Sequence, residues 1–84
     1  MKKKILLYTV TWCPHCVAII SFLDSNKIQY KNFDVEENDE WWQQALSRTG
    51  GVDIVPVIDV EGQVLWGVFD TSFESRLRKL LGIK

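Results

Sequence analysis

The 84-residue sequence has only two cysteines, one histidine, one methionine and two prolines. It also has no apolar run near the roughly 20 residues that a membrane-spanning helix requires. Because a structural zinc site needs four ligands, one chain with two cysteines and one histidine cannot supply a complete set. The scarcity of proline, with a hydrophobic fraction of 46%, indicates an ordered globular protein. We therefore expect one domain over residues 1–84, with no membrane partner and no resident metal ion.

An excess of charge of either sign is also absent, since 10 Lys and Arg nearly balance 11 Asp and Glu. Surfaces that bind nucleic acids are strongly basic, and the three lysines at positions 2–4 are too few to make one. The apolar run that follows them is shorter than the roughly 7–15 residues of a secretory signal. We therefore expect a cytoplasmic monomer with no nucleic-acid partner. In a reducing compartment, a close cysteine pair is more often catalytic or metal-binding than structural.

The spacing of apolar residues predicts helices and strands in the order βαβαββα. Strands are expected over residues 3–10, 28–35, 55–60 and 63–69, with a hairpin turn at 59–63. Helices are expected from Pro14 to about Asn26, from Asn38 or Asp39 to Gly50, and over residues 73–81. Asn26 is expected to close the first helix in the left-handed conformation. The first two strands should be parallel and the last two antiparallel, which predicts an α/β fold with one mixed four-stranded sheet flanked by three helices.

The sequence contains four tryptophans. Trp12 adjoins a cysteine, and we interpret it as part of a docking surface. Trp41 and Trp42 are adjacent and cannot share one helix face, so we expect one in the core and the other partly exposed. Trp66 is expected to pack on the sheet.

The motif Cys13-Pro14-His15-Cys16 lies between a predicted strand and a predicted helix. Pro14 suits the first helical turn, so Cys13 falls at the helix N-terminus, where unpaired N–H groups and the helix dipole stabilise a thiolate. Cys16 lies on the inner side of the same turn, within bridging reach. We predict that Cys13 attacks a disulfide and that Cys16 resolves the mixed disulfide. His15 is expected to favour the Cys13 thiolate further.

Other functions remain possible for the same thiols. They could hold an iron–sulfur cluster or another metal between two chains, or form a structural disulfide. They could also form a redox sensor that alters a partner surface around Trp12 and Phe69. The placement of the pair between a strand and a helix of a βαβ pattern favours redox chemistry.

The dipeptide Val55-Pro56 opens the third predicted strand. A proline there either marks an edge or first residue of the strand, or follows a cis peptide bond. A cis bond would leave the backbone of Val55 free to pair with an extended substrate. The residues alone leave both possibilities open.

Taken together, these motifs and the turn from Gly67 to Asp70 resemble a glutaredoxin over essentially the whole chain. The resemblance implies a thioredoxin-like fold with sheet order 2-1-3-4, a cis Pro56, and reduction of protein or glutathione mixed disulfides. It implies no tightly bound cofactor, with glutathione as a co-substrate. The substrate- or glutathione-binding residues that it implies are Trp12, Val55, Pro56, Gly67, Phe69 and Asp70.

Three positions depart from the glutaredoxin pattern. Val10 replaces a basic residue that meets a glutathione carboxylate, Ile54 replaces a threonine, and Val68 replaces the second glycine of a pair. Asp70 remains as a partner for the glutathione amino group. The departures bring the chain closer to glutaredoxin-like proteins that take electrons from a flavoprotein thioredoxin reductase. Either glutathione or such a reductase is therefore a candidate electron donor, and disulfide-containing proteins are the candidate substrates.

Overall fold

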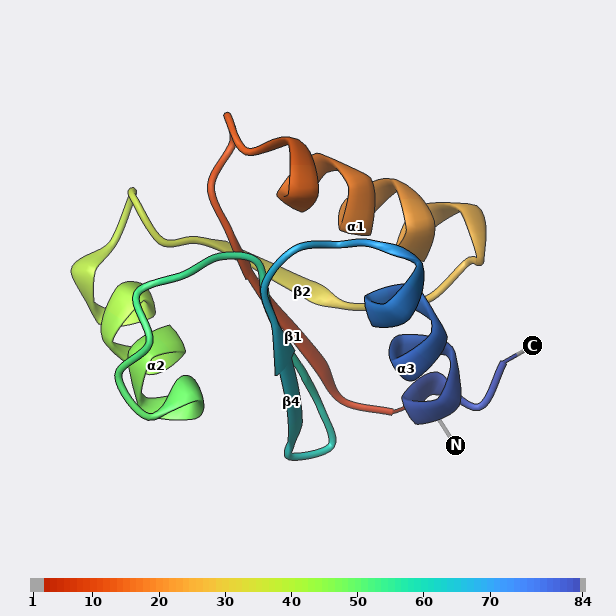
Figure 1. Ribbon diagram of the computed structural model, residues 1–84. Helices are drawn as coiled ribbons and strands as arrows, with labels where there is room; N and C mark the ends of the chain where they lie inside the picture. Colours follow the sequence, from red (N-terminus) through yellow and green to blue (C-terminus); the bar gives the residue numbers. More distant parts are fainter. Residues whose placement is uncertain (1–2, 84) are drawn as a thin grey trace.

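The computed structural model describes residues 3–83, and the predicted elements are present in the predicted order (Figure 1). They are β1 (Ile5–Thr9), α1 (Pro14–Ser25), β2 (Lys31–Asp34), α2 (Asp39–Thr49), β3 (Val57–Val60), β4 (Gln63–Trp66) and α3 (Thr71–Leu81). The sheet order is β2-β1-β3-β4, with β1 parallel to β2 and antiparallel to β3. This confirms the predicted fold class and sheet order. Within the described residues, no helix is both long enough and apolar enough to cross a membrane.

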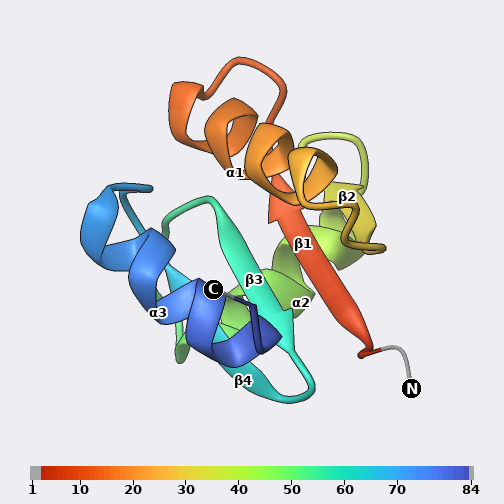
Figure 2. The same cartoon turned by 90° about the vertical axis from the view of Figure 1, so that its right-hand side faces the viewer.

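The sheet is covered on both faces, by α1 and α3 on one side and by α2 on the other (Figure 1, Figure 2). Neighbouring strand residues point to opposite faces, so the sheet has a hydrophobic cluster on each face. The cluster beneath α1 and α3 consists of Ile5, Leu7, Ile19, Leu23, Ile58, Val60, Phe73, Leu77 and Leu81. The second cluster consists of Tyr8, Val10, Cys13, Cys16, Val35, Ala45 and Val57. Both cysteines therefore belong to the hydrophobic core.

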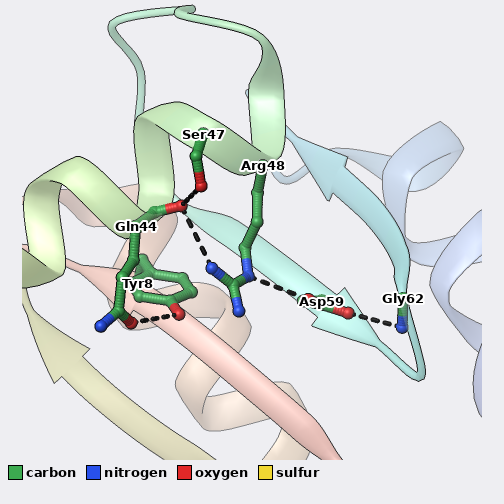
Figure 3. Close-up of polar contacts among 6 residues, drawn as sticks. All are labelled: Tyr8, Gln44, Ser47, Arg48, Asp59 and Gly62. Carbon is green, nitrogen blue, oxygen red and sulfur yellow. Dashed lines mark hydrogen bonds and ion pairs between the residues drawn. The ribbon is translucent and has the colours of Figure 1, made fainter.

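Polar contacts attach α2 to its face of the sheet (Figure 3). The Nε of Arg48 donates to Asp59 Oδ2 of β3 at 2.9 Å, and its guanidinium lies 5.1 Å from the centre of the Tyr8 ring. The Tyr8 hydroxyl donates to Gln44 Oε1 at 3.0 Å. Asp59 also accepts a hydrogen bond from the Gly62 N–H in the β3–β4 turn. Helix α2 is thus fixed to β1 and β3.

All four strands are shorter than predicted. The first spans Ile5–Thr9 instead of residues 3–10, and the other three are shortened for local reasons. The second begins at Lys31 instead of residue 28, because the chain is still closing α1 through the bond from the Ile28 N–H to the Leu23 carbonyl. The third begins at Val57, after a proline that has no N–H for the ladder. The fourth ends at Trp66, before Gly67 turns the chain with a φ of 113°.

Three smaller expectations were wrong. Lys27, with a φ of 56°, adopts the left-handed conformation after α1, whereas Asn26 has a φ of −95°. Trp41 and Trp42 are both half-buried, because both pack against the second cluster. Trp66 is 40% exposed, because β4 is the edge strand of the sheet.

Candidate active site

Cys13 is the residue that precedes the first turn of α1, with an extended backbone and Pro14 directly after it. No side chain caps this helix, and its first turn contains no acidic residue. Capping positions usually hold an oxygen that accepts from the free N–H groups. Here the sulfur of Cys13 stands at that position, so the positive end of the helix is available to a thiolate.

Cys16 lies one turn further along α1 and has no exposed surface, whereas Cys13 is 9% exposed. Burial raises the pKa of the Cys16 thiol to about 12, opposed by the Val10 backbone N–H, which hydrogen-bonds to the sulfur. The neighbouring Cys13 and the carboxylate of Asp34 raise this pKa further. Cys16 is therefore held as a neutral thiol. The predicted difference in burial between the two cysteines is confirmed.

The peptide bond between Val55 and Pro56 is cis, as the family resemblance implies. The carbonyl of Pro56 accepts a hydrogen bond from the Gly67 N–H at 3.2 Å, which ties this loop to the end of β4. The N–H and carbonyl of Val55 have no hydrogen-bond partner within residues 3–83. One backbone edge beside the cysteines is therefore available for pairing with another chain.

A groove of about 500 Å³ opens beside Cys13. Its walls come from three loops and from α2, which lie far apart in the sequence. The lining residues are Val10, Trp12, Cys13, Val35, Glu36, Trp42, Asp53, Ile54 and Val55. The structure thus brings the predicted residues Trp12 and Val55 together with Cys13.

Topology explains how the loops converge. The strands β1 and β2 are parallel, and their last residues, Thr9 and Asp34, are paired. The Val35 N–H also donates to the Thr9 carbonyl at 3.0 Å. Since both strands end at the same edge of the sheet, the segments that follow them leave side by side. This places Glu36 opposite Trp12, whose Nε1 donates to Glu36 Oε1 at 2.9 Å.

The other predicted site residues do not line the groove. His15 is half-buried in the first turn of α1. Phe69 packs against Phe22 and Phe73, and the Asp70 carboxylate accepts from the Phe73 N–H, capping α3. Gly67, which donates to the Pro56 carbonyl, lies in the turn between β4 and these residues.

Four lining residues were missed in the sequence: Val35, Glu36, Trp42 and Asp53. A signal was available for Val35 and Glu36, because they follow the strand expected to be parallel to the first. Nothing in the local sequence distinguished Asp53 from other acidic residues of turns.

The described part of the chain contains no cluster of three or more His, Cys, Asp or Glu side chains that could hold a metal ion. The two thiols are unbridged and form a pair without further ligands. This arrangement supports thiol–disulfide exchange. The sulfur of Cys13 lies at a helix N-terminus beside the groove, and the buried sulfur of Cys16 lies one turn further along the same helix.

Residues 5–65 match the model of the glutaredoxin family. The chain belongs to this family. It is 31% identical over 81 residues to glutaredoxin 1 of Rickettsia conorii, a match that covers 92% of this chain and 79% of that protein. It is 29% identical over 56 residues to mycoredoxin 1 of Corynebacterium glutamicum, covering 67% of this chain and 68% of that one. As a glutaredoxin, the protein is a thiol–disulfide oxidoreductase.

Solved structures share the glutaredoxin fold. The thioredoxin-like protein BC3987 matches with a TM-score of 0.80 and 29% identity, over 93% of this chain and 100% of that one. The glutaredoxin of Archaeoglobus fulgidus matches with a TM-score of 0.75 and 20% identity, over 93% of this chain and 85% of that one. The NrdH-redoxin of Escherichia coli, a glutaredoxin-like protein, matches with a TM-score of 0.71 and 22% identity, over 88% of this chain and 93% of that one. At these lower identities the likeness concerns the fold alone.

Proposed function

We propose that this glutaredoxin reduces protein disulfides through a dithiol cycle of Cys13 and Cys16. The observation that carries the proposal is the contrast between the two sulfurs. Cys13 opens on the groove at the N-terminus of α1, whereas Cys16 has no exposed surface. A substrate therefore reaches Cys13 first, and Cys16 reacts afterwards, with the Cys13 sulfur of the mixed disulfide.

In the first step the Cys13 thiolate attacks one sulfur of a substrate disulfide. A bond forms between Cys13 and that sulfur, the substrate S–S bond breaks, and the other substrate sulfur leaves as a thiolate that takes a proton. In the second step Cys16 loses its proton and attacks the Cys13 sulfur. The second substrate sulfur then leaves and is protonated. The substrate has gained two electrons and two protons, and the protein is left with a disulfide between Cys13 and Cys16.

The backbone of Val55 supplies the positioning in this proposal. Its N–H and carbonyl have no partner within residues 3–83, and Val55 lines the groove beside Cys13. An extended substrate segment that pairs with this edge would gain main-chain hydrogen bonds without a requirement for one sequence. The bond from the Gly67 N–H to the Pro56 carbonyl holds the loop that presents this edge, and Trp12 also lines the groove.

We further propose that electrons come from a flavoprotein thioredoxin reductase in preference to glutathione, and that the protein works in the reducing cytoplasm. Glutathione carries two carboxylates, and no basic residue is among the groove-lining residues of the described chain. Val10 lines the groove where the family resemblance implies a basic residue. The NrdH-redoxin of Escherichia coli is a glutaredoxin-like protein with a thioredoxin-like activity profile, a precedent for this choice of donor. A structure of buckwheat glutaredoxin contains glutathione, which keeps that donor as the alternative.

The deciding assay follows NADPH consumption with insulin as the disulfide substrate. Glutathione with glutathione reductase is one donor system, and thioredoxin reductase is the other. Faster turnover with thioredoxin reductase is expected. Turnover with glutathione alone would reverse the choice of donor, and no turnover with either would remove the proposed activity.

The roles of the two thiols are tested by single substitutions. Cys13→Ser should abolish turnover, because the attacking sulfur is lost. Cys16→Ser should accumulate a covalent adduct of protein and substrate on Cys13, visible by non-reducing electrophoresis and lost on treatment with dithiothreitol. An adduct that forms on Cys16 in the Cys13→Ser protein would show that the assignment of roles is inverted.

A further inference from the structure

The charges that line the groove beside Cys13 are all of one sign. Glu36 and Asp53 are its charged residues, both are exposed carboxylates, and they come from different loops. Most of the remaining wall is aliphatic or aromatic. A substrate that enters the groove therefore meets a mostly apolar lining and two negatively charged residues.

The carboxylate of Glu36 is held in a fixed position. Its Oε1 accepts the indole N–H of Trp12 at 2.9 Å, and its backbone N–H donates to Asp34 Oδ1 at 3.0 Å. The other oxygen, Oε2, has no partner within residues 3–83. Within residues 3–83, the Glu36 carboxylate thus lines the groove with Cys13 and forms no ion pair.

Asp53 belongs to the loop that carries the open backbone edge. It lies two residues before Val55, and its carboxylate has no ion pair or hydrogen bond within the described residues. A segment paired with the Val55 backbone would pass this carboxylate. The acidic stretch from Asp34 to Glu40 adds further negative charge beyond Glu36.

We propose that Glu36 and Asp53 determine substrate specificity, and that the groove selects protein disulfides whose cysteines are flanked by Lys or Arg next to aliphatic residues. This inference rests on the dithiol activity proposed above. Apolar neighbours of the substrate cysteine pack on Ile54 and Trp42, and its basic side chains pair with the two carboxylates. Segments with acidic flanks are repelled by the same two groups.

The test uses disulfide-linked dimers of a capped pentapeptide in which a central Cys lies between two Val, with both outer residues Lys, Gln or Glu. The rate of thiol release by the reduced protein is measured for each peptide at about 20 mM and about 500 mM salt. At low salt the Lys peptide should react on the order of tenfold faster than the Glu peptide. High salt should bring the two rates together, because exposed charges are screened.

The double variant Glu36→Gln, Asp53→Asn should lose this preference. Comparing two peptides within one variant cancels any change that affects both equally, and circular dichroism melting verifies that the variant is folded. Glu61→Gln makes the same chemical change in the β3–β4 turn, at the far end of the sheet from Cys13, and should keep the full preference.

A wild-type protein without preference, or a preference that persists in the double variant, would overturn the assignment of specificity and leave the dithiol activity standing. Failure to reduce even the uncharged Gln peptide would instead contradict the proposed function itself.

Discussion

At the scale of single residues, the burial of Cys16 has an effect on stability that can be separated from its redox role. The folded protein keeps the proton on Cys16 up to a pKa of about 12, whereas the ordinary value is 9.0. Above about pH 9 the unfolded chain therefore loses this proton first and binds fewer protons than the folded one. Because the unfolded chain binds fewer protons than the folded one, the free energy of unfolding decreases as pH rises above about 9.

This effect is tested on a background without Cys13. In Cys13→Ser, the contribution of Cys16 should shrink by about 1.4 kcal/mol per pH unit between about pH 9 and 10.5. The reference protein is Cys13→Ser, Cys16→Ser, which shares all other titrating groups, including Tyr8 and Tyr30. Denaturant unfolding of both proteins gives the difference at each pH. A difference that is independent of pH would mean that Cys16 is not buried as a neutral thiol.

Asp70 combines two possible roles that a conservative change can separate. Its carboxylate caps α3 by accepting from the Phe73 N–H at 2.9 Å, and the family resemblance makes it a glutathione contact. Asp70→Ala should lower the free energy of unfolding by about 1 kcal/mol, whereas Asp70→Asn should keep nearly all of it, because asparagine caps equally well. If Asp70 also meets the glutathione amino group, both variants should raise the KM for a glutathione mixed disulfide. An unchanged KM in Asp70→Asn would restrict Asp70 to capping.

At the scale of elements, the attachment of α2 to the sheet controls one wall of the groove, since Trp42 belongs to this helix. The ion pair between Arg48 and Asp59 is partly buried, with side chains 25% and 14% exposed. The same guanidinium lies over the Tyr8 ring and donates to the Gln44 carbonyl. These contacts use the planar, forked shape of arginine as well as its charge.

Replacement of Arg48 should separate the contribution of its charge from that of its planar, forked guanidinium. Arg48→Ala should cost about 1–2 kcal/mol of unfolding free energy, through the lost ion pair and ring contact. Arg48→Lys keeps the charge but loses the fork, so it should recover only part of this loss. Chemical denaturation with the matched variant Arg76→Ala, an exposed arginine of α3, provides the comparison. Equal stability of all these proteins would mean that α2 is held by its apolar contacts alone.

The elements themselves were readable from the sequence wherever periodicity or capping chemistry acts locally. Asn38 caps α2 and Gly50 ends it with a φ of 75°, as expected from residue type alone. The ends of strands were harder to predict from the sequence, because they depend on which neighbouring strand supplies hydrogen bonds. Val55 illustrates this, since its apolar side chain suits a strand while the following proline removes it from the ladder.

At the scale of the whole molecule, stability depends on a core shared between the sheet and the helices on one face. Leu77 of α3 has no exposed surface and lies in the cluster with Ile19 and Ile58. Leu77→Ala should lower the free energy of unfolding by about 3 kcal/mol, through lost burial and the cavity left behind. Val68→Ala, at a position 55% exposed, should change it by less than about 0.5 kcal/mol. Thermal or urea unfolding measures both, and similar losses would contradict this core assignment.

The active site was partly predictable at this scale. The motif from Cys13 to Cys16 carries its own chemistry and requires only a strand before it and a helix after it. Glu36 could have been inferred from the parallel pairing of the first two strands, whereas Asp53 could not, because it joins the groove only when the sheet order and the loop after α2 are both in place. In the sequence alone, Glu36 and Asp53 resemble ordinary solvent-exposed acidic residues of turns.

The proton on Cys16 also determines how many protons are released when the cysteine pair is oxidised. Because this thiol stays protonated to about pH 12, every oxidation of the cysteine pair at lower pH releases at least one proton with the two electrons. The reduction potential must therefore become more negative by at least about 30 mV for each unit rise in pH. The protein transfers hydrogen as well as electrons, and its reduction potential depends on the acidity of its surroundings.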